Sequence, residues 1–211
     1  MLFREHLMAQ PSGYLDVSAL GRDCDPVLLA QPDFTAKLVA DAHEALGLAW
    51  SYGGWLEDRS HLWAETYLKE TAHWLHLGLD VNAPAGTEVL ALLPGEVVYV
   101  GTDSPLVGGW GHHVIQKVEY RGKTHALMYA HLAAPLVAAG SRTEAGTPIG
   151  AIGTKDVNGY WFPHVHVQLF ADVDAVTDWA AFSQEVGGYG PLSEKAALAR
   201  KHPDPTPLLF A

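Results

Sequence analysis

Three short stretches of the sequence place histidine and acidic side chains at spacings typical of metal sites. Residues 76–80 read HLGLD, so that His76 and Asp80 lie four positions apart, and residues 164–166 read HVH. His131 lies near the end of a third run, residues 125–132, which is largely aliphatic. Neutral imidazole and carboxylate groups are common zinc ligands, and a catalytic zinc site combines three protein ligands with a water molecule. These stretches therefore predict a catalytic metal centre.

A period-two alternation in each run indicates the strands that must carry these side chains. In residues 75–83 the aliphatic side chains alternate with His76 and Asp80, and in residues 164–169 they alternate with His164 and His166. The same alternation in residues 125–132 predicts that His131 lies opposite Ala130 and Leu132. If the histidine-bearing faces of the three runs belong to one sheet, five side chains could converge in one groove. These are His76, Asp80, His131, His164 and His166.

Strand geometry limits how these residues can share one ion. Residues 76 and 80 of a straight strand lie roughly 13 Å apart, whereas zinc requires donor atoms about 2.0–2.2 Å away. The chain must therefore bend between them, and we expect Gly78 to permit the bend. His164 and His166 share a face about 6.5 Å apart along the strand, so one can bind the metal while the other reaches water or substrate.

The composition excludes several classes of partner. The chain has 211 residues, 24 of them acidic and 13 basic, and a formal net charge of −11, which argues against nucleic acid and anionic membranes. No apolar run approaches the roughly 20 residues that span a bilayer, and the N-terminus lacks the features of a secretory signal. With the single Cys24, these features predict no membrane insertion and, by default, a cytoplasmic location.

The patterning predicts a mainly β protein with helical extensions, of the α+β class. Residues 1–74 are expected to form a helical N-terminal extension, with helices at 33–50 and 61–74. Residues 75–170 contain short β-like runs broken by glycine, including a hairpin at 120–123, and predict an antiparallel sheet with a groove that carries the zinc site. Residues 171–211 are expected to form a helical and Pro-rich C-terminal extension that packs on this core.

The ordered motifs resemble the lysostaphin-type zinc metallopeptidases, a family of peptidoglycan endopeptidases with HxxxD and HxH motifs. The matching segments follow the family order and are residues 76–101, 108–116, 127–132, 137–153 and 163–168. The resemblance implies a small antiparallel β fold with a groove across the sheet. It further implies that His76, Asp80 and His166 bind Zn²⁺ and that His131 and His164 form the catalytic pair, one as general base and the other stabilising the tetrahedral oxygen.

Several positions depart from the family pattern without removing a ligand. The family usually has an arginine shortly before its first histidine, where this chain has Trp74 and Leu75. Gln168 stands where the family usually has glutamate, and His112 stands in place of a common asparagine. These departures bear on substrate preference.

Three classes of function are compatible with the sequence. The resemblance favours a zinc metalloendopeptidase that hydrolyses amide bonds in the cross-link or stem peptides of peptidoglycan, a substrate that members of the family usually meet in the periplasm or outside the cell. The alternative is a non-catalytic, metal-binding regulatory or interaction domain with the same fold. Two histidines and one carboxylate also suit a non-haem iron enzyme. The sequence does not determine the oligomeric state.

Overall fold

The computed structural model describes residues 1–103 and 108–211. Among these residues, eight strands form the main sheet in the order β1-β2-β4-β11-β8-β7-β6-β9. Neighbouring strands pair antiparallel except for the parallel pair β1 and β2. The strands are β1 (Ser12–Tyr14), β2 (Trp50–Gly53), β4 (Leu79–Asn82), β6 (Gly95–Thr102), β7 (His112–Tyr120), β8 (Lys123–Leu132), β9 (Arg142–Thr143) and β11 (Val165–Phe170). The predicted antiparallel core is confirmed.

Two smaller antiparallel pairs border the main sheet. One joins β5 (Glu88–Leu90) to β10 (Pro148–Ala151), and the other joins β3 (Leu75–His76) to β12 (Tyr189–Gly190). The second pair matters for the site, because it ties the strand of His76 to the C-terminal part of the chain.

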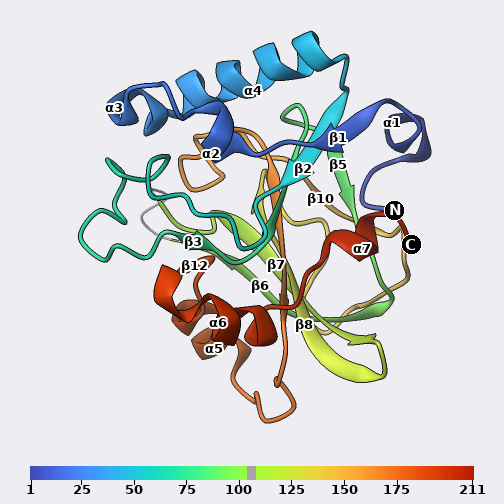
Figure 1. Cartoon of the computed structure of the whole chain (residues 1–211). Coiled ribbons are helices and arrows are strands. Elements are labelled where there is room, and N and C mark those ends of the chain that lie inside the picture. The colour runs from blue at the N-terminus through green and yellow to red at the C-terminus, as the bar shows by residue number, and fades with distance from the viewer. Residues whose placement is uncertain (104–107) are drawn as a thin grey trace.

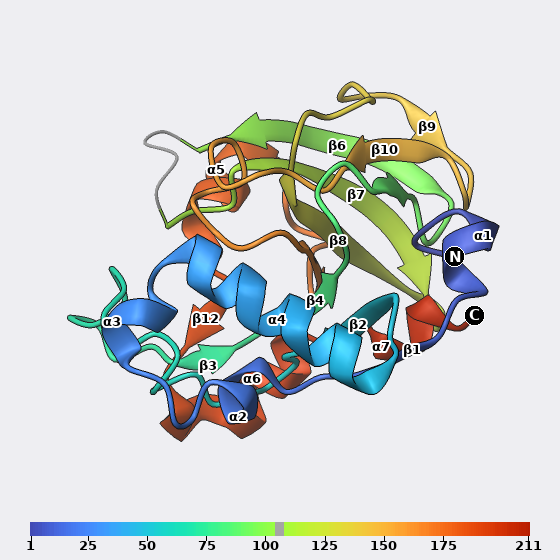
Figure 2. The same cartoon turned by 90° about the horizontal axis from the view of Figure 1, so that it is seen from above.

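Short helices flank the sheet on opposite sides. In Figure 1, α4 (Pro32–Leu46) lies along one side of the molecule, while α5 (Trp179–Glu185) and α6 (Lys195–Lys201) lie on the other. The remaining helices are α1 (Glu5–Met8), α2 (Val17–Leu20), α3 (Pro26–Leu29), the 3₁₀ turn η1 (Leu192–Glu194) and α7 (Thr206–Leu209). Both views place the two chain ends beside each other (Figures 1 and 2).

Both faces of the main sheet are buried. Leu127 and Val167 pack on one face in a core that also contains Phe3 and Leu209 from the two ends of the chain. On the other face, Met128 belongs to a separate buried cluster, against which side chains from α5 pack. Polar residues of the central strands, such as Gln116 and Gln168, are therefore buried as well.

The N-terminal segment is less helical than expected. The helix predicted at 33–50 exists as α4, which begins at Pro32. It ends at Leu46, before Gly47, whose backbone has a φ of +67°. The helix predicted at 61–74 is wrong, since the structure has successive turns there. Thr66 and Thr71 hydrogen bond to the backbone carbonyls of Trp63 and Leu68, which offers the chain an alternative to helix. The segment also contributes β1 and β2, which the sequence did not predict.

The expected bend between His76 and Asp80 is present. These residues lie in β3 and β4, which belong to different sheets, with residues 77–78 between them. The hairpin predicted at 120–123 is confirmed, because Tyr120 pairs with Lys123 and the two residues between them have positive φ. Positive φ at both central positions is typical of a type I′ turn.

No helix within residues 1–103 and 108–211 combines the length and apolar character that crossing a bilayer requires.

Candidate metal centre

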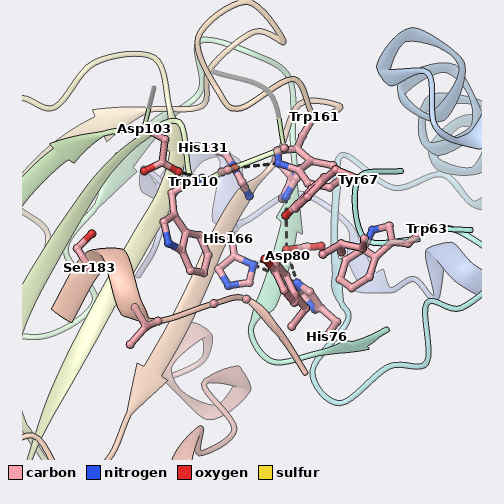
Figure 3. Close-up of a pocket in the computed structure, with 18 of the residues that line it drawn as sticks. Trp63, Tyr67, His76, Asp80, Asp103, Trp110, His131, Trp161, His166 and Ser183 are labelled. Carbon is pink, nitrogen blue, oxygen red and sulfur yellow. Dashed lines mark hydrogen bonds and ion pairs between the residues drawn. The ribbon is translucent and has the colours of Figure 1, made fainter. Parts of the chain in front are cut away.

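His76, Asp80 and His166 meet at one point in the structure (Figure 3). Nε2 of His76 lies 3.3 Å from Oδ1 of Asp80 and 3.1 Å from Nδ1 of His166. The distance from Nδ1 of His166 to the same Asp80 oxygen is 3.0 Å. All three side chains are buried.

Backbone and side-chain contacts fix the tautomers of both histidines. Nδ1–H of His76 donates to the carbonyl of Gly54 at 2.8 Å, which leaves Nε2 unprotonated. Nε2–H of His166 donates to Oε1 of Gln168 at 2.8 Å, which leaves Nδ1 unprotonated. The two free nitrogens are the atoms that face Asp80, as metal ligands require.

The donor set fits a divalent cation. Three electron-pair donors that face one another at 3.0–3.3 Å repel each other unless a cation or a proton lies between them. A tetrahedron with bonds of about 2.0–2.1 Å has edges of roughly 3.3–3.4 Å, which is close to these separations. Two imidazoles and one carboxylate of this geometry therefore suit zinc.

Gln168 holds His166 from the side away from His76 and Asp80. Its amide nitrogen donates to the carbonyl of Gly187 at 3.2 Å and to Nδ1 of His202 at 3.0 Å. These contacts fix the orientation of the amide, so that its oxygen rather than its nitrogen faces His166. The residue that departs from the family pattern therefore supplies the same kind of acceptor without a charge.

Gly78 is required for a different reason from the one predicted. Its φ is not positive, but a Cβ at this position would lie 2.3 Å from Nε2 of His166. Real Cβ atoms do not approach another atom that closely, so the imidazole occupies the space of the missing side chain. Gly78 thus provides room for His166 as well as lying in the bend.

The structure also brings His131 and His164 to this centre. Their ring centroids are 4.6 Å apart, and Nε2 of His164 lies 3.4 Å from Oδ1 of Asp80. The pairing register between β7 and β8 shifts just before Leu132, and His131 has a φ of +65°. Strict alternation would place His131 on the same face as Tyr129, within the main core. The irregularity turns the imidazole toward the centre instead, as bulges beside active sites do.

Both of these imidazoles present an unprotonated Nε2. Nδ1–H of His131 donates to the carbonyl of Asn158 at 2.7 Å, and Nδ1–H of His164 donates to the carbonyl of Phe162 at 2.8 Å. Burial lowers the pKa of each ring from its ordinary value, and the neighbouring His164 lowers that of His131 further. Both rings are therefore neutral proton acceptors at neutral pH.

Arg59 is a member of the site that the sequence analysis missed. Its Nη1 donates to Oδ2 of Asp80 at 2.7 Å, and its guanidinium is buried. Arg59 lies 17 positions before His76 in the sequence. The sequence offers one local indication of this role. Glu57 and Arg59, an acidic and a basic residue, follow a pair of glycines in a turn-rich stretch.

A cavity of about 650 Å³ opens onto the metal centre. Aromatic side chains from the turns before β3 form part of its wall, and the chain around β12 forms another part (Figure 3). The aromatic residues of the wall are Trp63, Tyr67, Tyr99, Trp110, Trp161, Phe162 and Tyr189. Such a volume suits a ligand the size of a short peptide.

The buried histidines predict that the metal-free protein loses stability in acid. Burial, with the charge of Arg59 second, lowers the pKa of His76 to about 3. Since an unfolded histidine takes up a proton near pH 6.5, stability falls from that pH downward by about 1.4 kcal/mol per unit for this group. Urea unfolding of chelator-treated protein at pH 7, 6 and 5 measures the slope.

Two variants isolate the contribution of His76. His76→Gln is expected to reduce the slope, whereas His6→Gln, at an exposed position, is expected to leave it unchanged. Asp80 adds to the loss only at lower pH: burial opposes its ionisation, but His76, Arg59 and His164 hold its pKa well below the usual value. Equal unfolding free energies at pH 7 and pH 5 would contradict the prediction.

Comparison with known proteins identifies the part of the chain that carries the centre. The model of peptidase family M23 matches residues 75–177. The uncharacterized lipoprotein YgeR of Escherichia coli (strain K12) is 34% identical over 86 residues, which is 41% of this chain and 32% of that protein. The chain thus spans about a third of the length of this curated relative.

Solved structures of similar proteins include two catalytic domains. The catalytic domain of the antimicrobial peptidase lysostaphin from Staphylococcus simulans is 24% identical, with a TM-score of 0.46, over 65% of this chain and 81% of that one. A mutant form of the catalytic domain of the prophage-encoded M23 protein EnpA from Enterococcus faecalis is 27% identical, with a TM-score of 0.41. That match covers 56% of this chain and 77% of the EnpA chain.

Proposed function

Because residues 75–177 belong to peptidase family M23, we propose that this protein is a zinc metalloendopeptidase. Its substrates would be the cross-link or stem peptides of peptidoglycan, or peptides that resemble them. The observation that carries the proposal is the convergence of Nε2 of His76, Oδ1 of Asp80 and Nδ1 of His166. The other atoms of these three groups are engaged by Gly54, Arg59 and Gln168. The aromatic cavity above the centre supports a peptide-like ligand.

In this proposal His76, Asp80 and His166 hold the ion. Bound zinc would polarise the scissile carbonyl and lower the pKa of a water molecule toward neutrality. The chain contributes the ligands in a fixed orientation, because Gly54 and Gln168 hold the two imidazoles from behind. Fixed ligand orientation is what distinguishes a preorganised site from a group of nearby side chains.

His131 and His164 would perform the proton transfers. Each offers a free Nε2, since its Nδ1–H is held by a backbone carbonyl. One of them accepts a proton from the attacking water and returns it to the leaving amine. The other has no hydrogen at Nε2 in the neutral tautomer present here, so it would take up a proton from solvent at that atom and then donate it in a hydrogen bond to the developing oxyanion.

The test is a metal assay followed by product analysis. Purified protein is expected to carry about one zinc ion per chain, and chelation is expected to abolish cleavage. Cross-linked peptidoglycan and model peptides are incubated with the zinc-loaded protein, and mass spectrometry of the products locates the new amine termini. Cleavage within the cross-bridge or stem identifies the bond.

Each alternative has its own outcome in the same assay. Iron in place of zinc would favour a non-haem iron enzyme. Bound zinc without cleavage of any wall type would favour the non-catalytic domain. A chain that neither contains zinc nor takes it up would contradict the metal site itself. The cytoplasmic location expected from the sequence stays a prediction, and wall peptides as substrates would require the chain to act outside the cytoplasm.

A further inference from the structure

Arg59 lies in the part of the chain that precedes the family match, yet it contacts the metal centre directly. Residue 59 belongs to the turns between β2 and β3, whereas the matched region begins at residue 75. Arg59 is 3% exposed, and its Nη1 donates to Oδ2 of Asp80 at 2.7 Å. The buried arginine therefore connects the N-terminal segment to one of the candidate ligands.

Besides Asp80, two side chains contact the guanidinium, and two further residues help to set its place. Trp63 packs its ring 5.3 Å from the guanidinium carbon, and Oε1 of Glu57 lies 3.4 Å from Nε. Glu57 is itself held by Ser18, whose hydroxyl donates to Oε1 at 2.6 Å. Gly54 leaves the space free, because a Cβ there would lie 2.4 Å from Nη2 of Arg59. The backbone carbonyl of the same glycine orients His76.

The two oxygens of Asp80 have different partners. Oδ2 accepts from Arg59, whereas Oδ1 faces His76, His164 and His166 at 3.0–3.4 Å. A free aspartate can rotate or offer both oxygens to a cation. An oxygen engaged by a charge-assisted hydrogen bond is held in place and is less available as a second ligand.

We propose that Arg59 is a positioning residue that holds Oδ2 of Asp80 and so leaves Oδ1 as the single oxygen that faces the metal. The proposal rests on the proposed zinc site, but it concerns a residue outside the matched family region. In this arrangement the N-terminal segment completes the centre rather than merely packing beside it. Glu57 and Ser18 keep Arg59 in place, and Arg59 in turn fixes the ligand.

Substitution of Arg59 by lysine separates positioning from charge. Lysine keeps the positive charge but loses the planar fork with which Arg59 reaches Asp80 and Glu57 together. Loss of the partner that orients a metal ligand typically costs about 10–100-fold in metal affinity, and we expect Arg59→Lys to weaken zinc binding by that factor. Competition with a chromophoric chelator measures the affinity, and the absorption spectrum of the Co²⁺-substituted protein reports the coordination.

His113→Gln is the matched control. It alters a buried polar group whose hydrogen bonds, with Gly111 and Ser183, lie outside the ion group of Arg59 and outside the candidate ligands. Both variants are expected to lower the thermal midpoint, but only Arg59→Lys is expected to change the zinc affinity and the Co²⁺ spectrum. If Arg59→Lys leaves the zinc affinity and the Co²⁺ spectrum unchanged, Arg59 contributes only a structural ion pair and the proposal is overturned.

A measurement on the unaltered chain covers the case in which Arg59→Lys fails to fold. The other arginines are exposed, so slowly exchanging guanidinium protons in a ¹⁵N-arginine spectrum identify Arg59. These protons are expected to stay protected after zinc is added, whereas rapid exchange in the zinc-loaded protein would show that Asp80 releases Arg59 and would overturn the proposal. If the unaltered chain binds no zinc, the proposed function fails first, and the two failures are thereby distinguished.

Discussion

His166→Ala is expected to abolish zinc binding under ordinary assay conditions, with the dissociation constant for zinc rising by at least ~10³-fold. The substitution removes Nδ1, one of three converging donors, and leaves only His76 and Asp80. It also removes the partner of the Gln168 amide oxygen. Loss of a partner that merely orients a ligand costs about 10–100-fold, and loss of the ligand itself costs more. Chelator competition and metal analysis of the purified variant measure the effect.

His113→Ala is the matched control for this substitution. His113 is also a buried strand histidine. Its Nδ1–H donates to the carbonyl of Gly111 and its Nε2 accepts from the hydroxyl of Ser183, and neither contact belongs to the metal centre. This variant is expected to be destabilised and yet to bind zinc as the unaltered chain does. Zinc affinity that is retained in His166→Ala, or lost equally in both variants, would contradict the assignment of His166 as a ligand.

The sequence brought His76, Asp80 and His166 together because their signal is local. These three residues lie in short strands, and His164 directly precedes β11. The alternation of each run separates the candidate donors from the aliphatic side chains. In β11 this holds in the structure, since Val165 and Val167 enter the core opposite the histidines. Residue type, spacing and a single face are sufficient there.

The sequence placed His131 in the site, and the structure also brings it there. The straight-strand alternation used to place it, however, does not hold in the structure. Straight alternation puts it beside Tyr129, which the structure buries in the main core. The side chain reaches the centre only because the strand is irregular and His131 adopts a φ of +65°. A bulge depends on the pairing of two strands, so no pattern within residues 125–132 reports it.

The N-terminal part of the site was not predictable for a related reason. Arg59 and Asp80 are 21 positions apart, and the contact exists only because the turns of residues 59–74 fold back over the sheet. The aliphatic and aromatic spacing within 61–74 resembles a helix. The same side chains, including Trp63 and Leu68, are used instead to fill a buried cluster and to line the cavity. Tertiary packing overrode a local preference in this segment.

His131→Ala and His164→Ala are expected to lower the rate of peptide cleavage by about 10²–10⁴-fold while zinc affinity stays within about tenfold of the unaltered chain. Each variant removes a free Nε2 beside the ligands without removing a ligand. Because alanine is strained at the positive φ of residue 131, His131→Asn, which tolerates that conformation, provides a second variant. Zinc content and turnover are measured together for each protein.

The combination of the two measurements discriminates between the roles. A His164→Ala variant that loses zinc while His166→Ala keeps it would reverse the assignment within the HVH stretch. Full cleavage activity with zinc retained in all the histidine variants would place the reaction elsewhere in the chain. We expect His131→Asn and His164→Ala to cleave slowly and to retain zinc, and we expect His166→Ala to lose zinc. The reason is that, of the three histidines, only His166 directs a free nitrogen at both His76 and Asp80.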